Sequence, residues 1–445
     1  MLNTLRERNA DFRTVSNYAI NSIAKRTRAL TVRSQTSIKR VENYQNIQKA
    51  ARQVYEALGR ACTKHAEHLT LFCVEAENAS QDEGSEPKVR FNIAFTQPCA
   101  DPHSTQTKPL WFMVDSVIGE VAAGGKLGNL VDLNGLTEGL QSQFEPRLGT
   151  TNTTGRNSAK AASSLAQSTL SPSSPLPMIT GSFVLNEGSE RNLCDHLQRC
   201  LGQTPPEDVC LGILENVNSC KNHVYPPPSA IRSRWPYATS LGNIVSSTAL
   251  QQSMSRIPLL ERLRLARTLA IAVLQYHATP WLRMSWRKED VHFLGLDMNP
   301  KKYNILSLST PCLNVKIKGP NETVSRASTF PLDNPVRNPL TFSLGVLLLE
   351  IAYSASLESL QRNNDNPARP NDSSYLEFYL ARRLSKSGCT GMGTVYDKIV
   401  EKLVECDFGC GTDLTNVDLQ AAIHDHVICP LEEMERGMAA LMSGL

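Results

Sequence analysis

The sequence lacks a segment that could direct secretion or cross a membrane. Its first residues, M-L-N-T-L-R-E-R-N-A-D-F, hold no apolar core of the kind that a signal peptide carries. The longest apolar run, residues 344–349, ends at Glu350 and is far shorter than the roughly 20 residues that a spanning helix needs. Without an oxidising destination, the 12 cysteines are expected to be reduced thiols. We therefore expect a soluble intracellular protein, in the cytoplasm or the nucleus.

A strong net charge is also missing. The chain carries 46 Lys and Arg residues against 43 Asp and Glu residues, so it has no overall attraction for nucleic acid. Residues 1–60 differ, because 12 basic and 4 acidic residues give them an excess of 8 positive charges. We expect this excess to lie on a solvated helical face; the alternative is a weak contact of residues 1–60 with an anionic membrane surface or an acidic partner. Aromatic residues do not alternate with the basic ones, so no nucleic-acid partner is expected.

The sequence has no complete motif for a hydrolase or for nucleotide binding by a phosphate loop. Residues 119–127 approach such a loop, but the spacing is one residue too long and Leu127 lacks the hydroxyl that would hold magnesium. No Gly-X-Ser-X-Gly elbow and no His-Glu-X-X-His helix occurs. These absences leave hydrolase chemistry without a nucleophile or a metal, and no cofactor is expected.

Four residues with metal-binding side chains fall within a short span, namely Cys62, His65, His68 and Cys73. We expect most of this span to be helical. On one helix the first three share a face, whereas Cys73 points elsewhere. Because structural zinc sites usually take paired ligands from separate loops, we expect buried core residues here and no metal.

Hydrophobic periodicity sets the other expected elements. Apolar residues recur at helical spacing over residues 41–71, which predicts one long helix. Residues 147–177 are rich in Ser, Thr and Pro and lack aromatic and acidic residues, so we expect a disordered insertion. Alternation of apolar and polar residues predicts short strands at 89–95, 110–117, 181–185, 209–214 and 223–225.

The segment at 259–293 resembles the scaffold of a protein-kinase catalytic loop. Its apolar spacing predicts a buried helix over 259–274 that Pro280 ends, and Val291 and Phe293 alternate as a short strand. Between such a helix and strand a kinase carries H-R-D-L-K-P-E-N, with the aspartate as base and the asparagine on magnesium. This chain has a loop of the same length there.

The key positions of that loop differ from those of a working kinase. Arg283 stands at the histidine position, Ser285 at the aspartate, Arg287 at the lysine and Asp290 at the asparagine. A serine hydroxyl cannot accept a proton at neutral pH as a carboxylate can. The loop therefore resembles a kinase in its frame and lacks the base.

A second segment, L-T-F-S-L-G-V-L-L-L-E-I at 340–351, resembles the start of the central kinase helix, D-V-Y-S-L-G-V-L-L-L-E-I. The aspartate that anchors the catalytic loop in a kinase is Leu340 here. Upstream, T-S-L-G-N-I-V at 239–245 fits the point where a kinase hinge enters the first helix of the large lobe. Three pieces thus follow one another in the order that a kinase has.

The metal-binding D-F-G motif is missing at its expected place. No aspartate lies between Asp297 and Asp333, so the main magnesium ligand has no candidate. A D-F-G string at 407–409 comes after the central helix, and we expect a turn there. A V-A-I-K motif is absent as well.

Together these segments resemble an uncharacterised family of kinase-like proteins from filamentous fungi, classed as a domain of unknown function. The resemblance covers about residues 45–100 and 178–438 and is strongest near the carboxyl end. It implies a degenerate protein kinase fold and an association with fungal self-recognition and immune-like signalling. The features that carry it are the Cys62–His68 patch, T-S-L-G-N-I-V, L-Q-Y-H-A-T-P-W-L, F-S-L-G-V-L-L-L-E and the tail C-D-F-G-C-G-T-D-L…V-I-C-P-L-E-E-M.

We therefore expect an α+β protein with a bilobal, protein-kinase-like fold. Residues 1–78 would form a basic helical N-terminal region, 86–238 a reduced small lobe with the disordered insertion, and 239–445 a helical large lobe. The expected function is a catalytically inactive signalling or scaffold module that binds a protein partner. One alternative is an atypical ATP-dependent phosphotransferase in which Asp290 or Asp297 binds the metal and Arg287 holds a phosphate. Another is a purely structural helical adaptor without kinase ancestry.

Overall fold

The computed structural model describes the parts of the chain that form helices, strands and their nearest connections. The chain divides into two compact units, Met1–Gly119 with Gly181–Leu445, and Glu120–Thr180, and every described residue belongs to the first. The predicted disordered insertion and the predicted strand at 181–185 lie outside the described residues. The described residues are 36–62, 67–78, 88–96, 109–117, 192–203, 205–215, 221–228, 238–246, 258–294, 310–318, 335–362, 373–388 and 390–443.

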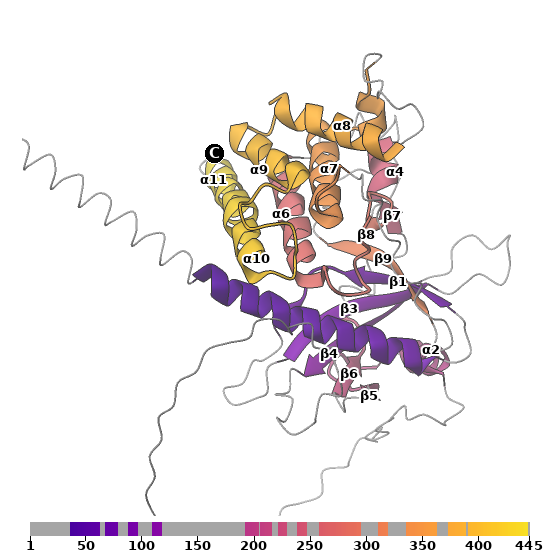
Figure 1. The fold of residues 1–445 in the computed structure, drawn as a ribbon. Coiled ribbons are helices and arrows are strands. Elements are labelled where there is room, and N and C mark those ends of the chain that lie inside the picture. The colour runs from indigo at the N-terminus through magenta and orange to yellow at the C-terminus, as the bar shows by residue number, and fades with distance from the viewer. Residues whose placement is uncertain are drawn as a thin grey trace, which may run out of the picture. The chain divides into compact units, whose positions relative to one another are not determined.

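A long helix over residues 36–61 opens the described chain (Figure 1, indigo). Its inner face packs on the turn after α6 (Leu259–Tyr276), where Trp281 Nε1 donates a 2.7 Å hydrogen bond to the Ala51 carbonyl. The buried residues of that face recur every three or four positions, as an amphipathic helix requires: Val41, Tyr44, Ile47, Ala51, Val54 and Leu58. The predicted helix is therefore confirmed over residues 41–61.

The prediction that this helix continues to Leu71 was wrong. Residues 67–73 form strand β1 (Glu67–Cys73) instead. β1 is hydrogen-bonded along both edges, to β3 (Lys88–Thr96) and to β9 (Pro311–Lys318). These ladders satisfy the backbone groups of β1 through segments distant in sequence, and such pairing overrides a local helical pattern.

The strands of the described chain form one sheet in the order β5-β6-β4-β3-β1-β9-β8-β7, with β2 paired to β3. All of these pairings are antiparallel. The predicted strands at 89–95, 110–117 and 223–225 are confirmed, and the one at 209–214 begins later, at Gly212. The remaining strands are β2 (Glu77–Asn78), β4 (Leu110–Val117), β5 (Gly212–Glu215), β6 (Lys221–Tyr225), β7 (Ala238–Ser240) and β8 (Val291–Leu294).

This sheet takes strands from all three predicted regions. β1 comes from the N-terminal region, and its register with β9 runs from the pair Glu67 and Lys318 to the pair Cys73 and Cys312. β9 pairs with β8 and β8 with β7, whose Thr239 opens the predicted large lobe. The three regions are thus connected in one sheet, and the positions of their boundaries as domains stay a prediction.

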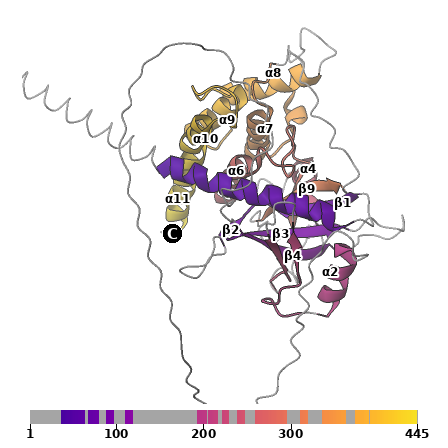
Figure 2. The same ribbon diagram turned by 60° about the horizontal axis from the view of Figure 1, so that its bottom comes forward.

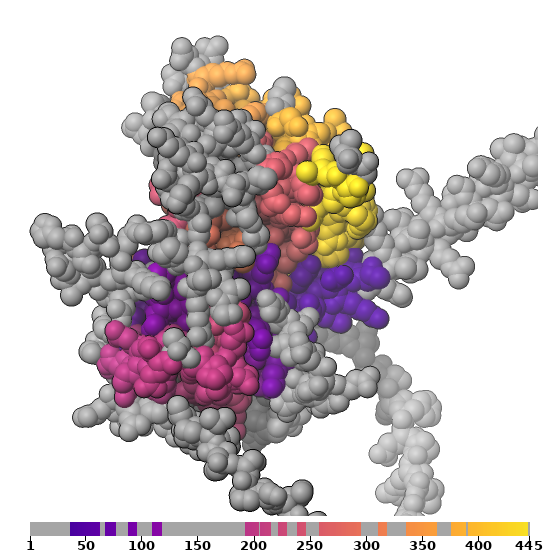
Figure 3. Space-filling model, turned by 180° about the vertical axis from the view of Figure 1, so that it is seen from behind, coloured from indigo at the N-terminus to yellow at the C-terminus, as the bar shows by residue number. Residues whose placement is uncertain are grey.

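The helices after residue 258 pack around two apolar helices, α6 and α7 (Pro339–Tyr353). α7 is buried along nearly its whole length, which is typical of a helix inside a core. α6 contacts α7 and α11, and α9 contacts α7 and α8 (Figures 1 and 2). Figure 3 shows α11 in yellow beside α6 on the face seen from behind. The other helical elements are α2 (Leu193–Gly202), α4 (Leu241–Ser246), the 3₁₀ turn η1 (Leu357–Leu360), α8 (Ser373–Lys386), α9 (Thr394–Glu405), α10 (Val417–Ile423), the π-helical turn η2 (His424–Ile428) and α11 (Cys429–Ser443).

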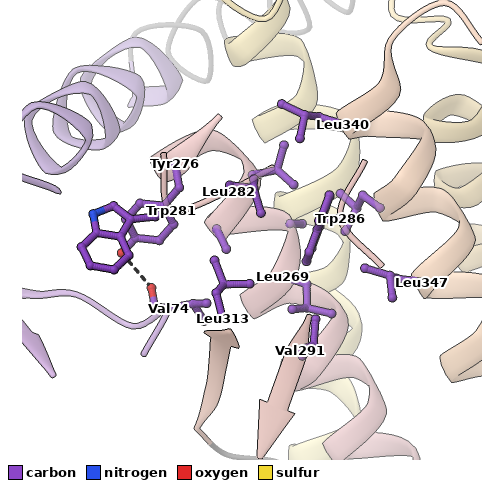
Figure 4. Packing of buried hydrophobic residues seen from close by; sticks show 14 of the residues in the cluster. Val74, Leu269, Tyr276, Trp281, Leu282, Trp286, Val291, Leu313, Leu340 and Leu347 are labelled. Atoms are coloured by element: carbon purple, nitrogen blue, oxygen red, sulfur yellow. Dashed lines mark hydrogen bonds between the residues drawn. The ribbon is translucent and has the colours of Figure 1, made fainter. Parts of the chain in front are cut away.

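One hydrophobic core joins the sheet to these helices. The Trp281 ring stacks on Phe72 of β1 with centroids 4.1 Å apart and an angle of 16° between the ring planes. Tyr276 at the end of α6 donates a 3.0 Å hydrogen bond to the Val74 carbonyl just after β1 (Figure 4). The α+β class is confirmed by this packing of helices on an antiparallel sheet. No helix of the described chain is both long and apolar enough to cross a membrane.

Candidate functional site

The loop at 283–290 joins α6 to β8 and is anchored by two buried tryptophans. α6 ends at Tyr276, a few residues before Pro280, so the predicted end of the helix is close to the observed one. Trp281 and Trp286 are each only 1% exposed and fill the core on either side of Leu282 (Figure 4). Their burial fixes the path of the loop between them, because each removes a large apolar surface from water.

Asp290 closes the last turn of this loop. Its Oδ2 accepts a hydrogen bond of 2.9 Å from the Arg287 backbone N–H, and the Asp290 N–H donates to the Arg287 carbonyl, also at 2.9 Å. The guanidinium of Arg283 lies 4.0 Å from Oδ1, and the Asn314 N–H of β9 donates to the Asp290 carbonyl. Asp290 therefore holds the loop to itself and to the sheet.

The other predicted loop positions face outward. Arg283, Ser285 and Arg287 are exposed, and Arg287 donates a 3.0 Å hydrogen bond to Glu377 of α8. Exposure leaves the Ser285 hydroxyl in contact with solvent at the place where a kinase has its base.

Leu340, at the predicted anchor position, is buried in the first turn of α7. The anchoring side chain is Asn338, whose Oδ1 accepts hydrogen bonds of 3.0 Å from the N–H groups of Leu340 and Thr341. Its Nδ2 donates at 2.8 Å to the Thr412 carbonyl. Sequence reasoning missed Asn338, although asparagine before Pro339 is a signal for a helix N-cap.

Lys288 connects the loop to the far end of α7. Its Nζ donates hydrogen bonds to Glu350 Oε1 at 2.7 Å and to Glu358 Oε2 at 3.0 Å; we call these three residues the Lys288 cluster. Lys288 is 9% exposed and Glu350 only 2%. Glu350 Oε1 also accepts the Leu357 N–H at 2.9 Å, so the cluster orders η1 as well. Sequence reasoning missed it, although a glutamate that interrupts an apolar helix signals a buried ion pair.

The pKa shifts in the Lys288 cluster follow from its burial. Burial raises the pKa of Glu350, and the hydrogen bond from Lys288 only partly opposes that rise. Burial lowers the pKa of Lys288, but the hydrogen bonds and charges of Glu350 and Glu358 outweigh it, so that pKa is raised overall. Lys288 thus stays protonated at neutral pH, and its positive charge is paired with Glu350 and Glu358.

A cavity of about 310 Å³ opens beside the loop. Four carboxylates line it, from Glu289, Glu350, Glu358 and Glu377, against two cations, Arg287 and Lys288. The excess of negative charge disfavours a triphosphate and favours a cationic group. Its apolar wall comes from α7: Phe342, Val346 and Leu347.

Gly242 of α4 brings the hinge-like segment against the loop. Its N–H donates a 3.1 Å hydrogen bond to the Lys288 carbonyl, and a Cβ at this position would lie 3.0 Å from Glu289 Oε1. Because Gly242 has no side chain, the start of α4 can approach the loop at Lys288 and Glu289 closely.

Groups that could share a metal ion occur elsewhere in the described chain. The ligand atoms of Cys62, His68 and Cys194 lie within 4.8 Å of one another, as do those of a second set in and after η2. The prediction that the Cys62–Cys73 span is helical was wrong for His68 and Cys73, which lie on β1. His65 lies outside the described residues, and Cys194 was missed because α2 is distant in sequence.

The fold defines an α+β protein in which helices pack on one antiparallel sheet. A family described as a domain of unknown function (DUF7580) matches residues 165–436, and the chain belongs to it. No curated protein and no solved structure matches. An uncharacterised family is therefore confirmed, whereas its kinase-like and fungal character stays a prediction.

Proposed function

We propose that the chain is a catalytically inactive, kinase-like module that acts by binding a protein partner. The observation that carries the proposal is that charged side chains of the loop at 283–290 form hydrogen bonds within the protein. Asp290 accepts the Arg287 N–H at 2.9 Å, and Lys288 donates to Glu350 at 2.7 Å. These charged groups of the loop thus bind other parts of the protein, whereas phosphoryl transfer needs charged groups directed at phosphates and metal.

The order and pairing of the elements support the kinase-like part of the proposal. A short strand, β7, is followed by α4, the buried helix α6, the loop, the strands β8 and β9, and then the buried helix α7. β7 pairs with β8 through Thr239 and Phe293, which places the hinge-like segment beside the strand that follows the loop. A sheet that includes Ser240 also favours this interpretation over a purely helical adaptor.

The atypical-phosphotransferase alternative depends on metal binding by Asp290 or Asp297. Asp290 Oδ1 already faces the Arg283 guanidinium at 4.0 Å, and a cation there opposes a metal ion. Asp297 lies outside the described residues. Arg287, the residue assigned to phosphate in this alternative, is paired with Glu377 at 3.0 Å. These contacts favour the inactive module.

A nucleotide-binding experiment tests the inactive state. We expect isothermal titration of the full chain with ATP and magnesium to give no heat of binding, and thermal unfolding to be unchanged by millimolar ATP. Magnesium-dependent binding that Asp290→Asn abolishes would favour the phosphotransferase. Asn at this position still accepts the Arg287 N–H, so the comparison does not depend on an unfolded variant.

A capture experiment tests the partner. The cavity presents an excess of carboxylates, so we expect a partner with a basic side chain to bind there. Ser343→Trp would fill the cavity from α7 without removing a charge, and Gly437→Ala on α11, with nothing within 4 Å of its added Cβ, is the matched control. A partner captured by the full chain and the control, and lost with Ser343→Trp, supports the proposal. Capture that Ser343→Trp leaves unchanged would contradict binding at the cavity.

A further inference from the structure

Three metal-binding side chains from three separate elements meet in the core. Cys62 follows the helix over 36–61, His68 is in β1, and Cys194 is in the first turn of α2. The two sulfurs are 3.6 Å apart, and Cys194 Sγ lies 3.6 Å from His68 Nε2 and 3.8 Å from Nδ1. The three residues are 1%, 5% and 3% exposed, respectively.

These distances match the edges of a tetrahedral zinc site. Zinc lies about 2.3 Å from sulfur and about 2.1 Å from nitrogen, so tetrahedral angles place two sulfurs about 3.8 Å apart and a sulfur and a nitrogen about 3.6 Å apart. The observed separations of 3.6 Å for both kinds of pair agree with this within the tolerance of about 0.2 Å expected for a metal site. The third pair, Cys62 and His68, has its ligand atoms within 4.8 Å of each other, so one ion could contact all three side chains after a modest side-chain movement.

The donor chemistry selects the metal. Two thiolates and an imidazole are soft and borderline ligands that favour zinc over magnesium or calcium, which prefer oxygen. Cysteine binds zinc as a thiolate, so each thiol of the pair must lose its proton when an ion binds. A divalent ion stabilises thiolates and releases those protons on binding.

The surroundings would hold the imidazole in place. The His68 ring stacks on Phe95 of β3 with centroids 4.9 Å apart and an angle of 26° between the planes. That contact fixes the ring orientation, as ligand histidines require. An ion here would join the end of the N-terminal helix, the sheet and α2.

We propose that Cys62, His68 and Cys194 are three ligands of a structural zinc ion, with the fourth tetrahedral position left to a further donor. The second set of metal-binding groups, His424, Asp425 and Cys429, lies within one helical stretch and joins no separate segments. It carries no such proposal.

Metal analysis of the full chain, purified without chelator, tests the site. We expect one equivalent of zinc per chain, lost in Cys62→Ser and in Cys194→Ser. Cys200→Ser is the matched control, because Cys200 lies on the same helix α2 outside the trio, and it should keep its zinc. A full chain without zinc, or zinc that both ligand variants retain, would overturn the proposal.

A second measurement does not depend on the stability of the variants. After removal of metal with a chelator, cobalt(II) added to the full chain should give the intense visible bands of tetrahedral thiolate coordination. Zinc should raise the melting temperature, whereas magnesium should not. Absence of both effects in a chain that is still folded would show that the trio is ordinary core packing.

Discussion

Lys288 Nζ lies 2.7 Å from Glu350 Oε1, and this pair joins the loop at 283–290 to the end of α7. Both residues are buried, and Glu350 is the one charged residue among the buried residues of that helix. A buried ion pair has a high desolvation cost, so it is retained only where its geometry and additional hydrogen bonds are good. Here the Leu357 N–H and Glu358 supply them.

Removal of one partner should be strongly destabilising. We expect Lys288→Met to lower the free energy of unfolding by about 3–5 kcal/mol, because Glu350 is left buried without its cation. Lys288→Met combined with Glu350→Gln should cost clearly less than the sum of the single changes. Denaturant unfolding of the four proteins measures this.

An exposed pair provides the control for that cycle. Lys316 and Glu67 are about half exposed, at 47% and 51% of their side chains, so Lys316→Met should cost less than about 1 kcal/mol. If Lys288→Met cost no more than Lys316→Met, the structural role of the Lys288 cluster would be refuted.

Gly345 sets the distance between α7 and α9. A Cβ there would lie 2.9 Å from Val404 Cγ2 and 3.2 Å from the Val404 backbone nitrogen. Gly345→Ala is therefore expected to be less stable than Gly437→Ala by about 1–3 kcal/mol, since both gain the same helical propensity and only one meets a neighbour. Equal melting temperatures of the two variants would contradict close packing of α7 on α9.

Asn338 should contribute as an N-cap. Asn338→Ala is expected to cost about 1–2 kcal/mol, because α7 loses the acceptor for two N–H groups and Thr412 loses a donor. Asn338→Ser keeps a capping oxygen and should recover part of that loss. If Asn338→Ser were no more stable than Asn338→Ala, the loss of stability would come from the hydrogen bond to the Thr412 carbonyl, and the N-cap role would be contradicted.

Buried His277 and half-buried His292 predict a loss of stability in mild acid. Burial lowers the pKa of both below the ordinary value of 6.5, while nearby backbone hydrogen bonds oppose the shift. The unfolded chain therefore binds more protons than the folded one, and stability falls as pH drops through about 6.5. The slope should reach at most about 1.4 kcal/mol per pH unit for each histidine.

Urea unfolding between about pH 7.5 and pH 5.5 measures this slope. His277→Gln should flatten it, because glutamine can replace the hydrogen bond to the Leu274 carbonyl without titrating. A slope that His277→Gln leaves unchanged would assign the acid sensitivity to other groups.

The elements with strong local patterns could be predicted from the sequence. α6, α7, β3 and β4 follow from periodicity within their own residues. β1 could not, because its strand character depends on β9, which supplies Cys312 opposite Cys73 from 239 residues away. The local apolar pattern of residues 67–71 favours a helix, but pairing with β3 and β9 makes this segment a strand.

The candidate site was found only in part for the same reason. The loop positions from Arg283 to Asp290 follow from order along the chain, but the role of Asp290 in closing its own turn is a matter of geometry. The Lys288 cluster and the trio of Cys62, His68 and Cys194 each join segments remote in sequence. One sequence shows that such residues exist and gives no means to pair them.

A phosphate-transfer assay on the full chain tests the central claim most directly. The chain is incubated with γ-labelled ATP and magnesium or manganese, alone and with a generic protein substrate, beside Asp290→Asn and Lys316→Met. We predict no labelled phosphate on any protein above the level with Asp290→Asn, because Ser285 supplies no base and Asp290 is used to close the loop. Metal-dependent transfer that Lys316→Met keeps and Asp290→Asn abolishes would contradict this account.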